Sequence, residues 1–357
     1  MKKYEASKNK TKYNDEQKEK IEDIFLVIKN LMHFYQEYMC YNFYQSIENA
    51  EIFLEKVNDD SEFGEHNKYF YLRTIKLIEN LKQIKDFSNI LSINIIYSLD
   101  PLDLSIFEKR NFPYLEQLIL TNLRIKDISA LLSCQFPVLK KLNLENNLID
   151  NKVIEILKKI SLPEITYISL YVNNITSLEI FDVIKRFSKL TSFHIGENKF
   201  DFKTDKKAFY EFPEDLEELG LTGNFDGKNI EFIEKLKLGI SKLKTFYFSR
   251  NKLTNLKSLK NIKFERLYKV WAISNEITDI KEIMNIQNRN DLTIINLKEN
   301  KIKNFNELID IISDFPKLEE LDVSFNEIKK EEVEDIKKMI KEKYNRDLNI
   351  INKIEHS

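Results

Sequence analysis

The sequence predicts an α/β solenoid, in which parallel strands form one inner sheet and return segments, several of them helical, form the outer layer. Three observations predict it. An eleven-residue pattern recurs every 24 to 27 residues, prolines recur just before it, and both ends of the chain depart from it. A period of this length is typical of solenoids, because one repeat cannot bury its own apolar face without its neighbours.

The repeat has the form LxxLxLxxNxL. Its clearest copies begin at Leu139, Ile165, Leu190, Leu216, Leu243, Leu267, Leu292 and Leu318. An earlier copy at Leu115 has Leu123 in the place of the asparagine, and a weaker first copy begins at Ile90. Because side chains alternate along a strand, positions 4 and 6 are predicted to enter the core, while positions 3, 5 and 7 face the other side.

The asparagine at position 9 predicts a buried column of amides with a structural role, which we call the asparagine ladder. An amide both donates and accepts hydrogen bonds, so it can satisfy the backbone groups left unpaired where each strand turns away. The members of the ladder are Asn147, Asn173, Asn198, Asn224, Asn251, Asn275, Asn300 and Asn326.

The return segments are read from proline and from apolar spacing. Five of the six prolines precede a repeat by two or three residues: Pro113, Pro137, Pro163, Pro213 and Pro316. Proline biases the preceding residue toward extended backbone, which suits entry into the next strand. The segments that start at Asp150 and Asn306 have apolar residues spaced by three and four, which predicts short convex helices.

From residue 90 to the end, the repeat resembles that of the leucine-rich repeat superfamily, intracellular type, without favouring a subfamily. The resemblance implies a right-handed horseshoe of about ten repeats, with a parallel sheet on the concave face and helices on the convex face. It further implies a non-enzymatic module that binds a protein or peptide on the concave face, as an inhibitor, regulator or adaptor.

Four regions are expected along the chain. They are a disordered polar tail at 1–13, a helical N-terminal cap or small helical domain at 14–88, the solenoid at 89–328, and a C-terminal cap at 329–357.

Both ends carry sequence that differs from the repeat. Helical apolar spacing runs through 14–57, and a second helix is predicted from about Lys68 to Asp86. A cap is favoured over a separate recruitment domain, because the segment is short for an autonomous core. In the C-terminal cap, the sequence predicts a charged helix from Lys329 and then a closing strand at Leu348.

Charge, cysteine content and hydropathy limit the classes of function that the sequence supports. The formal charge is −2, from 56 basic and 58 acidic residues, so no net positive field favours nucleic acid or an anionic membrane. Cys40 and Cys134 are far apart, which supports neither a disulfide scaffold nor a zinc site and fits a reducing compartment. No signal-peptide pattern and no run of about 18 apolar residues is present, so a cytoplasmic protein is expected.

The candidate partner-binding residues lie at outward motif positions 2, 3, 5, 7 and 8. They are Tyr167, Tyr171, His194, Lys244, Tyr247, Arg250, Tyr268, Lys269, Trp271, Lys298, Glu319, Glu320 and Asp322. Tyr247 and Trp271 occupy position 5 of consecutive copies and should stand side by side. A trough is expected at Gly196, Gly220 and Gly223, between the aromatic groups, with His194 on its wall. The acidic residues from Glu299 to Asp322 favour a partner with a basic patch.

Other interpretations are weaker but remain open. The outward rings could simply pack on one another or on the cap. Rings interleaved with Arg and Lys could bind single-stranded nucleic acid or a nucleoprotein, although outward positions hold six basic against nine acidic residues. Neither a catalytic set, a metal site nor a cofactor motif is expected, because His194 has no nucleophile beside it in the sequence and the six glycines form no phosphate loop.

Overall fold

The computed structural model describes residues 69–72, 87, 90–96, 101–227, 230–236, 240–287 and 289–353. The chain divides into two compact units, Met1–Gly64 and Glu65–Ser357, and every described residue belongs to the second. The tail predicted at 1–13 and the helix predicted across 14–57 lie outside the described residues.

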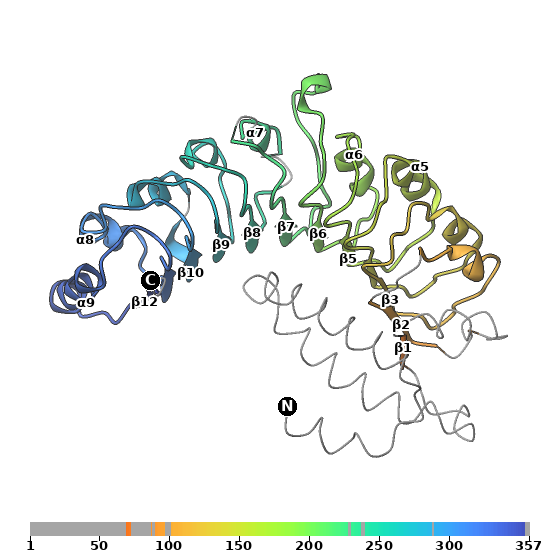
Figure 1. The fold of residues 1–357 in the computed structure, drawn as a ribbon, viewed down its shortest axis with the longest axis horizontal. Coiled ribbons are helices and arrows are strands. Elements are labelled where there is room, and N and C mark those ends of the chain that lie inside the picture. Colours follow the sequence, from red (N-terminus) through yellow and green to blue (C-terminus); the bar gives the residue numbers. More distant parts are fainter. Residues whose placement is uncertain are drawn as a thin grey trace, which may run out of the picture. The chain divides into compact units, whose positions relative to one another are not determined.

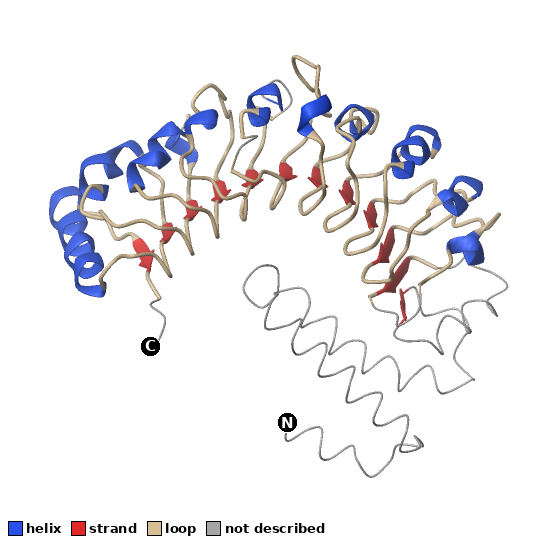
Figure 2. Cartoon of the chain, turned by 45° about the horizontal axis from the view of Figure 1, so that its top comes forward, coloured by secondary structure: helices blue, strands red, loops and turns tan. Residues whose placement is uncertain are grey.

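The second unit contains one parallel sheet whose twelve strands follow one another in chain order (Figure 1). The strands are β1 Tyr69–Leu72, β2 Ser92–Ile95, β3 Gln117–Leu120, β4 Lys141–Asn143, β5 Tyr167–Ser169, β6 Ser192–His194, β7 Glu218–Gly220, β8 Thr245–Tyr247, β9 Lys269–Trp271, β10 Ile294–Asn296, β11 Glu320–Asp322 and β12 Asn349–Ile351. Figure 2 shows these strands along the inner side of the repeat unit and the helices along its outer side. The predicted solenoid is confirmed.

The outer layer mixes α-helices with short 3-10 helices. The α-helices are α5 Lys152–Lys159, α6 Ile180–Ile184, α7 Phe232–Leu236, α8 Leu308–Ile311 and α9 Lys330–Tyr344. The 3-10 helices are η1 Leu104–Phe107, η2 Ser129–Ser133, η3 Phe202–Thr204, η4 Lys257–Leu259, η5 Ile280–Asn285, η6 Arg289–Asp291 and η7 Ile312–Asp314. The helices predicted from Asp150 and Asn306 are present as α5 and as α8 with η7. None of the described helices combines the length and apolarity needed to cross a bilayer.

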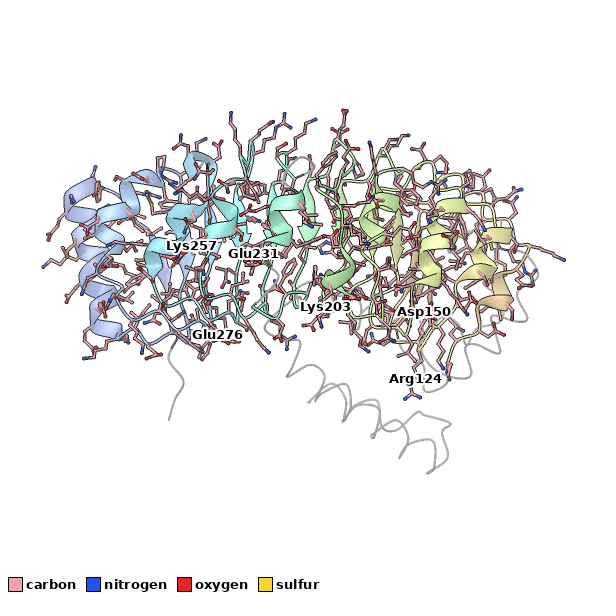
Figure 3. All side chains as sticks on the ribbon, turned by 90° about the horizontal axis from the view of Figure 1, so that it is seen from above. Arg124, Asp150, Lys203, Glu231, Lys257 and Glu276 are labelled. Carbon is pink, nitrogen blue, oxygen red and sulfur yellow. The ribbon has the colours of Figure 1, made fainter. Side chains whose placement is uncertain are left out.

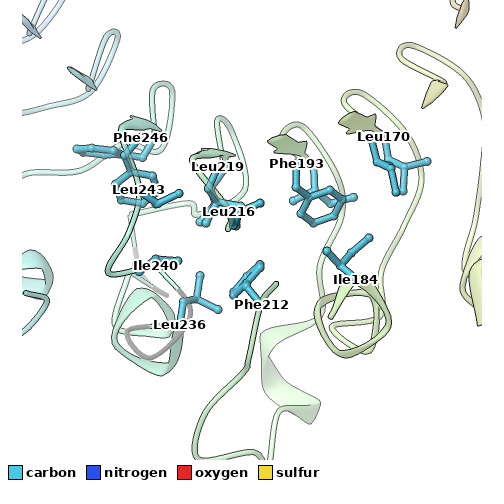
Figure 4. Packing of buried hydrophobic residues seen from close by; sticks show 14 of the residues in the cluster. Leu170, Ile184, Phe193, Phe212, Leu216, Leu219, Leu236, Ile240, Leu243 and Phe246 are labelled. Atoms are coloured by element: carbon cyan, nitrogen blue, oxygen red, sulfur yellow. The ribbon is translucent and has the colours of Figure 1, made fainter. Parts of the chain in front are cut away.

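The core lies between the sheet and the outer layer. Leu219 of β7 pairs in register with Phe246 of β8, and both side chains are fully buried. Below them, Leu216 and Leu236 pack from the start of the repeat and from α7 (Figure 4). Positions 4 and 6 of successive repeats therefore stack into continuous apolar columns.

The asparagines at position 9 bridge neighbouring repeats. Asn251 is fully buried, and its Oδ1 accepts hydrogen bonds from the backbone nitrogens of Asn224 (2.8 Å) and Phe225 (2.9 Å) in the preceding repeat. Its Nδ2 donates to the carbonyls of Leu221 (3.2 Å) and Phe248 (2.8 Å). Amide-to-backbone bonds to the preceding repeat are also made by Asn147, Asn173, Asn198, Asn224, Asn275, Asn300 and Asn326.

Position 8, just before each of these asparagines, has left-handed backbone in every copy from Leu115 onward. The φ angles run from 51° to 68° at Asn122, Asn146, Val172, Glu197, Gly223, Arg250, Ser274, Glu299 and Phe325. Each strand therefore leaves the sheet through the same tight turn.

One predicted element is wrong in part. Tyr69–Leu72 forms β1, which pairs with β2, so the helix predicted from Lys68 cannot begin there, and the sheet starts before the expected solenoid boundary at residue 89. Tyr and Phe fit a strand well, and in a short segment their spacing did not separate strand from helix.

The C-terminal end of the solenoid is covered by α9, which buries Val333, Ile336 and Ile340. β12 then adds the last strand beside β11. Both elements lie where the sequence predicts a charged helix and a closing strand.

Candidate functional site

The predicted site residues lie on or beside the inner strands. Register places Tyr167, Lys269 and Glu320 at position 3 of their repeats and His194, Tyr247, Trp271 and Asp322 at position 5. Positions 3 and 5 face away from the core columns, so these side chains share the concave face of the sheet.

Four aromatic rings form a row across β5, β6, β8 and β9, and we name it the ring row: Tyr167, His194, Tyr247 and Trp271. Ring centroids are 5.4 Å apart for Tyr167 and His194, and 5.6 Å apart for His194 and Tyr247. Tyr247 and Trp271 stack at 6.1 Å with 23° between their planes. The prediction that Tyr247 and Trp271 stand side by side is confirmed, and the rings pack on one another while each keeps part of its surface exposed.

Gly220 of β7 makes the row continuous. It lies in register between His194 of β6 and Tyr247 of β8. A Cβ atom at Gly220 would come within 2.5 Å of His194 Nδ1, so only glycine lets the imidazole lean over β7 and reach Tyr247.

The trough expected at the three glycines is therefore wrong. Tyr171 lies over Gly196, where an added Cβ would meet its ring at 2.9 Å, and Glu197 lies over Gly223 at 2.5 Å. Neighbouring side chains occupy the space that the missing Cβ atoms leave.

A polar cluster lies beside His194, at position 3 of β6 and β7. Ser192 Oγ lies 3.1 Å from His194 Nε2 and donates to Glu218 Oε2 at 3.0 Å, while His194 Nε2 lies 3.8 Å from the same carboxylate oxygen. The neighbouring imidazole of His194 lowers the pKa of Glu218, and Ser192 and Lys269 add to this against the effect of burial. Glu218 is therefore ionised at neutral pH.

This cluster does not have the geometry of a catalytic triad. Ser192 and Glu218 both approach the same imidazole nitrogen, so the ring cannot pass a proton from one to the other. Ser192 is also buried, and its hydroxyl bonds the carboxylate directly.

The two tyrosines of the row are neutral phenols. Burial raises the pKa of Tyr247 to about 12, and the nearby Glu218 and Tyr268 add to the shift. Burial also raises the pKa of Tyr167, with further contributions from Glu145 and Glu218. Both hydroxyls therefore remain donors through the physiological pH range.

Several predicted cations are already engaged. Arg250 Nη1 reaches over Gly223 to Glu197 Oε1 at 3.1 Å, and Lys244 Nζ lies 2.5 Å from Glu217 Oε1. The distance from Lys298 Nζ to Glu299 Oε1 is 3.5 Å.

Other cations lie on rings. Lys269 Nζ lies 5.3 Å from the Tyr268 ring centroid, and Lys298 Nζ lies 5.0 Å from that of Phe325. These contacts hold both lysine side chains against rings of the protein itself.

The predicted acidic residues lie two strands beyond the ring row. Trp271 aligns with Asn296 of β10, which aligns with Asp322 of β11. Asp322 accepts from the backbone nitrogen of Ser324 at 2.9 Å, and Glu319 is exposed. The face thus has rings at its centre and carboxylates toward its C-terminal end.

Three further side chains contribute to this surface and are not among the predicted partner-binding residues: Ser192, Glu197 and Glu218. Glycine was the available signal, because Gly220 and Gly223 leave room for the side chains of the preceding repeat. That signal was interpreted as empty space.

Both signs of charge are spread over the rest of the unit. Figure 3 labels basic residues, Arg124, Lys203 and Lys257, and acidic residues, Asp150, Glu231 and Glu276, along the same unit. In the described part of the chain, no group of three or more His, Cys, Asp or Glu side chains is arranged to hold a metal ion.

No protein-family model and no curated protein sequence matches the chain. Among solved structures, it is similar to an internalin, InlF, from Listeria monocytogenes, at 20% identity and TM-score 0.48, over 78% of this chain and 84% of that one. It is also similar to the LRR protein LIC12759 of Leptospira interrogans (19%, TM-score 0.36, 80% and 82% covered) and to internalin C2 of L. monocytogenes (14%, TM-score 0.32, 78% and 90% covered).

The assignment of the fold rests on the chain itself. An LxxLxLxxNxL repeat, one parallel strand per repeat, outer return segments and a buried asparagine bridge between repeats are present together. The chain is a leucine-rich repeat solenoid.

Proposed function

We propose that this protein is a non-enzymatic interaction module that binds a protein or peptide partner on the concave face of the sheet, as an inhibitor, regulator or adaptor. The ring row carries the proposal. Trp and Tyr dominate the energetics of protein interfaces, because they bury a large area and lose little conformational entropy on binding.

The ring row suits this role because its rings are fixed before a partner arrives. Stacking holds Tyr247 against Trp271, and His194 contacts Tyr247 from the other side. A side chain that is already ordered loses less entropy on binding, so more of its contact energy contributes to affinity.

Single-stranded nucleic acid is the weaker candidate. Bases stack on open ring faces, whereas Tyr247 and Trp271 present one face each to the other. The ionised and partly exposed Glu218 beside His194 would repel a phosphate backbone.

The proposal is tested by affinity capture from a nuclease-treated lysate of the source cell. The wild type is compared with a Tyr247→Ala, Trp271→Ala double variant and with a matched control, Tyr114→Ala, Phe209→Ala. Tyr114 and Phe209 are exposed aromatic residues outside the strands, at 58% and 48% exposure. A protein captured by the wild type and the control but not by the ring-row variant supports the proposal, and equal capture by all three contradicts it.

A further inference from the structure

The centre of the ring row has an exposed carboxylate. Glu218 is at position 3 of β7, and its side chain is 41% exposed even though its Oε2 accepts from Ser192. Because Gly220 has no side chain at position 5 of the same strand, no other β7 side chain stands between the carboxylate and the rings of His194 and Tyr247.

Aromatic rings lie near this carboxylate: His194 Nε2 is 3.8 Å from its Oε2, and the centroids of the Tyr167 and Tyr247 rings lie 5.4 Å and 5.6 Å from that of His194. It contributes to the raised pKa values of both Tyr167 and Tyr247, after burial, so it acts on phenols on either side of β7. Ring faces carry negative potential and attract cations, and desolvation strengthens the attraction. A carboxylate between such rings therefore favours a positively charged group.

The protein's own cations contact one or the other kind of group nearby. Lys141 Nζ lies 4.7 Å from the Tyr167 ring centroid, and Arg250 reaches over Gly223 to Glu197. The carboxylate of Glu218, in contrast, has only His194 as an ionisable partner within 4 Å among the described residues. Lys269 is two strands away, at position 3 of β9, and its Nζ lies on Tyr268.

We infer that Glu218, with His194 and Tyr247 beside it, receives a lysine or arginine side chain of the protein partner. This inference deepens the proposed function and rests on it. The charge of Glu218 selects a cationic head group, and the exposed parts of the rings provide apolar contacts for its aliphatic stem. The partner segment that crosses the ring row is therefore basic.

Trp271 allows a direct test, because it is the only tryptophan of the chain and stacks on Tyr247. The full-length protein is titrated with an acetylated, amidated tetra-arginine peptide while tryptophan fluorescence is recorded, and a tetra-glutamate peptide is the charge-reversed probe. We expect a saturable change with tetra-arginine, none with tetra-glutamate, and at least ten-fold weaker tetra-arginine binding by the Glu218→Gln variant.

Glu164→Gln is the matched control. Glu164 is also 41% exposed and pairs with Lys189 at 2.6 Å, but it precedes β5 and lies outside the outward strand positions. It should bind tetra-arginine as the wild type does, and thermal unfolding verifies that both variants fold. Equal tetra-arginine affinity of the wild type and Glu218→Gln, or a response to tetra-glutamate alone, overturns the inference.

Failure of the cation assignment to Glu218 can be distinguished from failure of the proposed function. A captured partner that is lost with the ring-row variant but binds Glu218→Gln at wild-type affinity leaves the concave site in place and overturns the cation assignment. Tetra-arginine binding through Glu218, with capture unchanged by the ring-row variant, supports the cation site and overturns the proposed function.

Discussion

Position 8 of the repeat requires a conformation that most residues avoid. The nine copies from Leu115 onward have φ between 51° and 68° there, and the occupants include Asn, Gly, Arg and also Val172. A β-branched residue is especially unfavourable in the left-handed region, because its Cβ substituents clash with the backbone. The backbone at Val172 is therefore strained, and contacts with the neighbouring repeats hold it in this conformation.

Replacing Val172 by asparagine should raise the free energy of unfolding by about 1 kcal/mol, because asparagine tolerates left-handed backbone better than valine does. Asn122 and Asn146 already occupy this position in earlier repeats. Val172→Thr, which keeps the branched shape, should bring no gain. Chemical denaturation of the three proteins checks this, and equal stability of all three would show that the turn is not strained.

The asparagine bridges contribute to stability but not to the binding surface. Asn251→Ala would leave two buried backbone N–H groups and two carbonyls without their amide partner, and should lower the free energy of unfolding by about 2 to 3 kcal/mol. Asn306→Ala, at an exposed site, is the control. Unchanged thermal unfolding of Asn251→Ala would contradict the ladder, as would a loss of partner affinity in a folded variant.

For single residues, the sequence predicts the strand position and the register that the repeat determines. It predicts few of the contacts that individual side chains then make. The Tyr247–Trp271 stack follows from register alone, because consecutive copies place position 5 on adjacent strands. The contact of His194 with Tyr247 could not be predicted, since it depends on how one imidazole leans over Gly220. The same limit explains why Glu218 was missed.

At the level of elements, the return segments differ far more than the strands do. The green segment between β6 and β7 reaches farther from the sheet than its neighbours (Figure 1) and contains only η3. Asp205 ties it down, since its carboxylate accepts from Tyr210 Oη (2.9 Å), the Lys207 backbone nitrogen (3.1 Å) and Lys235 Nζ of α7 (2.8 Å). A repeat length of 24 to 27 residues leaves room for a helix without requiring one, so the sequence predicts outer elements less well than strands.

The pKa of Asp205 gives a pH-dependent prediction. Burial opposes ionisation, but the bonds from Lys235, Lys207 and Tyr210 outweigh it and hold the pKa of this carboxyl below its ordinary value. The folded-state pKa is thus lower than the unfolded one, so the stabilisation is present above the ordinary carboxylate range of about 4 and is lost as the pH falls through the folded-state pKa.

Asp205→Asn should therefore lower the free energy of unfolding at pH 7 by about 1 to 3 kcal/mol, and the difference from the wild type should shrink as the pH is lowered. The control is Asp291→Asn, whose carboxylate pairs with Lys317 at the surface and should cost less than about 1 kcal/mol. Denaturation curves from pH 7 to pH 3 measure both. A difference that stays constant across this range would refute the electrostatic role of Asp205.

At the scale of the whole molecule, the described unit is stabilised by contacts between neighbours. Each strand pairs with the strands of adjacent repeats, each position-9 asparagine bonds the repeat before it, and α9 closes the C-terminal end of the core. In such an array stability comes from the contacts between neighbouring repeats, and the rings of the ring row lie outside the buried columns of positions 4 and 6. The ring row can therefore be altered without unfolding the solenoid, which makes the binding proposal testable by substitution.

The central claim is that the ring row binds the partner, and its most direct test is the affinity of the captured partner measured by calorimetry. Replacing Tyr247 and Trp271 by alanine should cost at least about 2 kcal/mol, or about thirty-fold in Kd, with the thermal unfolding transition nearly unchanged. The Tyr114→Ala, Phe209→Ala control should bind as the wild type does. An unchanged Kd for the ring-row variant would contradict the account and place the partner elsewhere on the molecule.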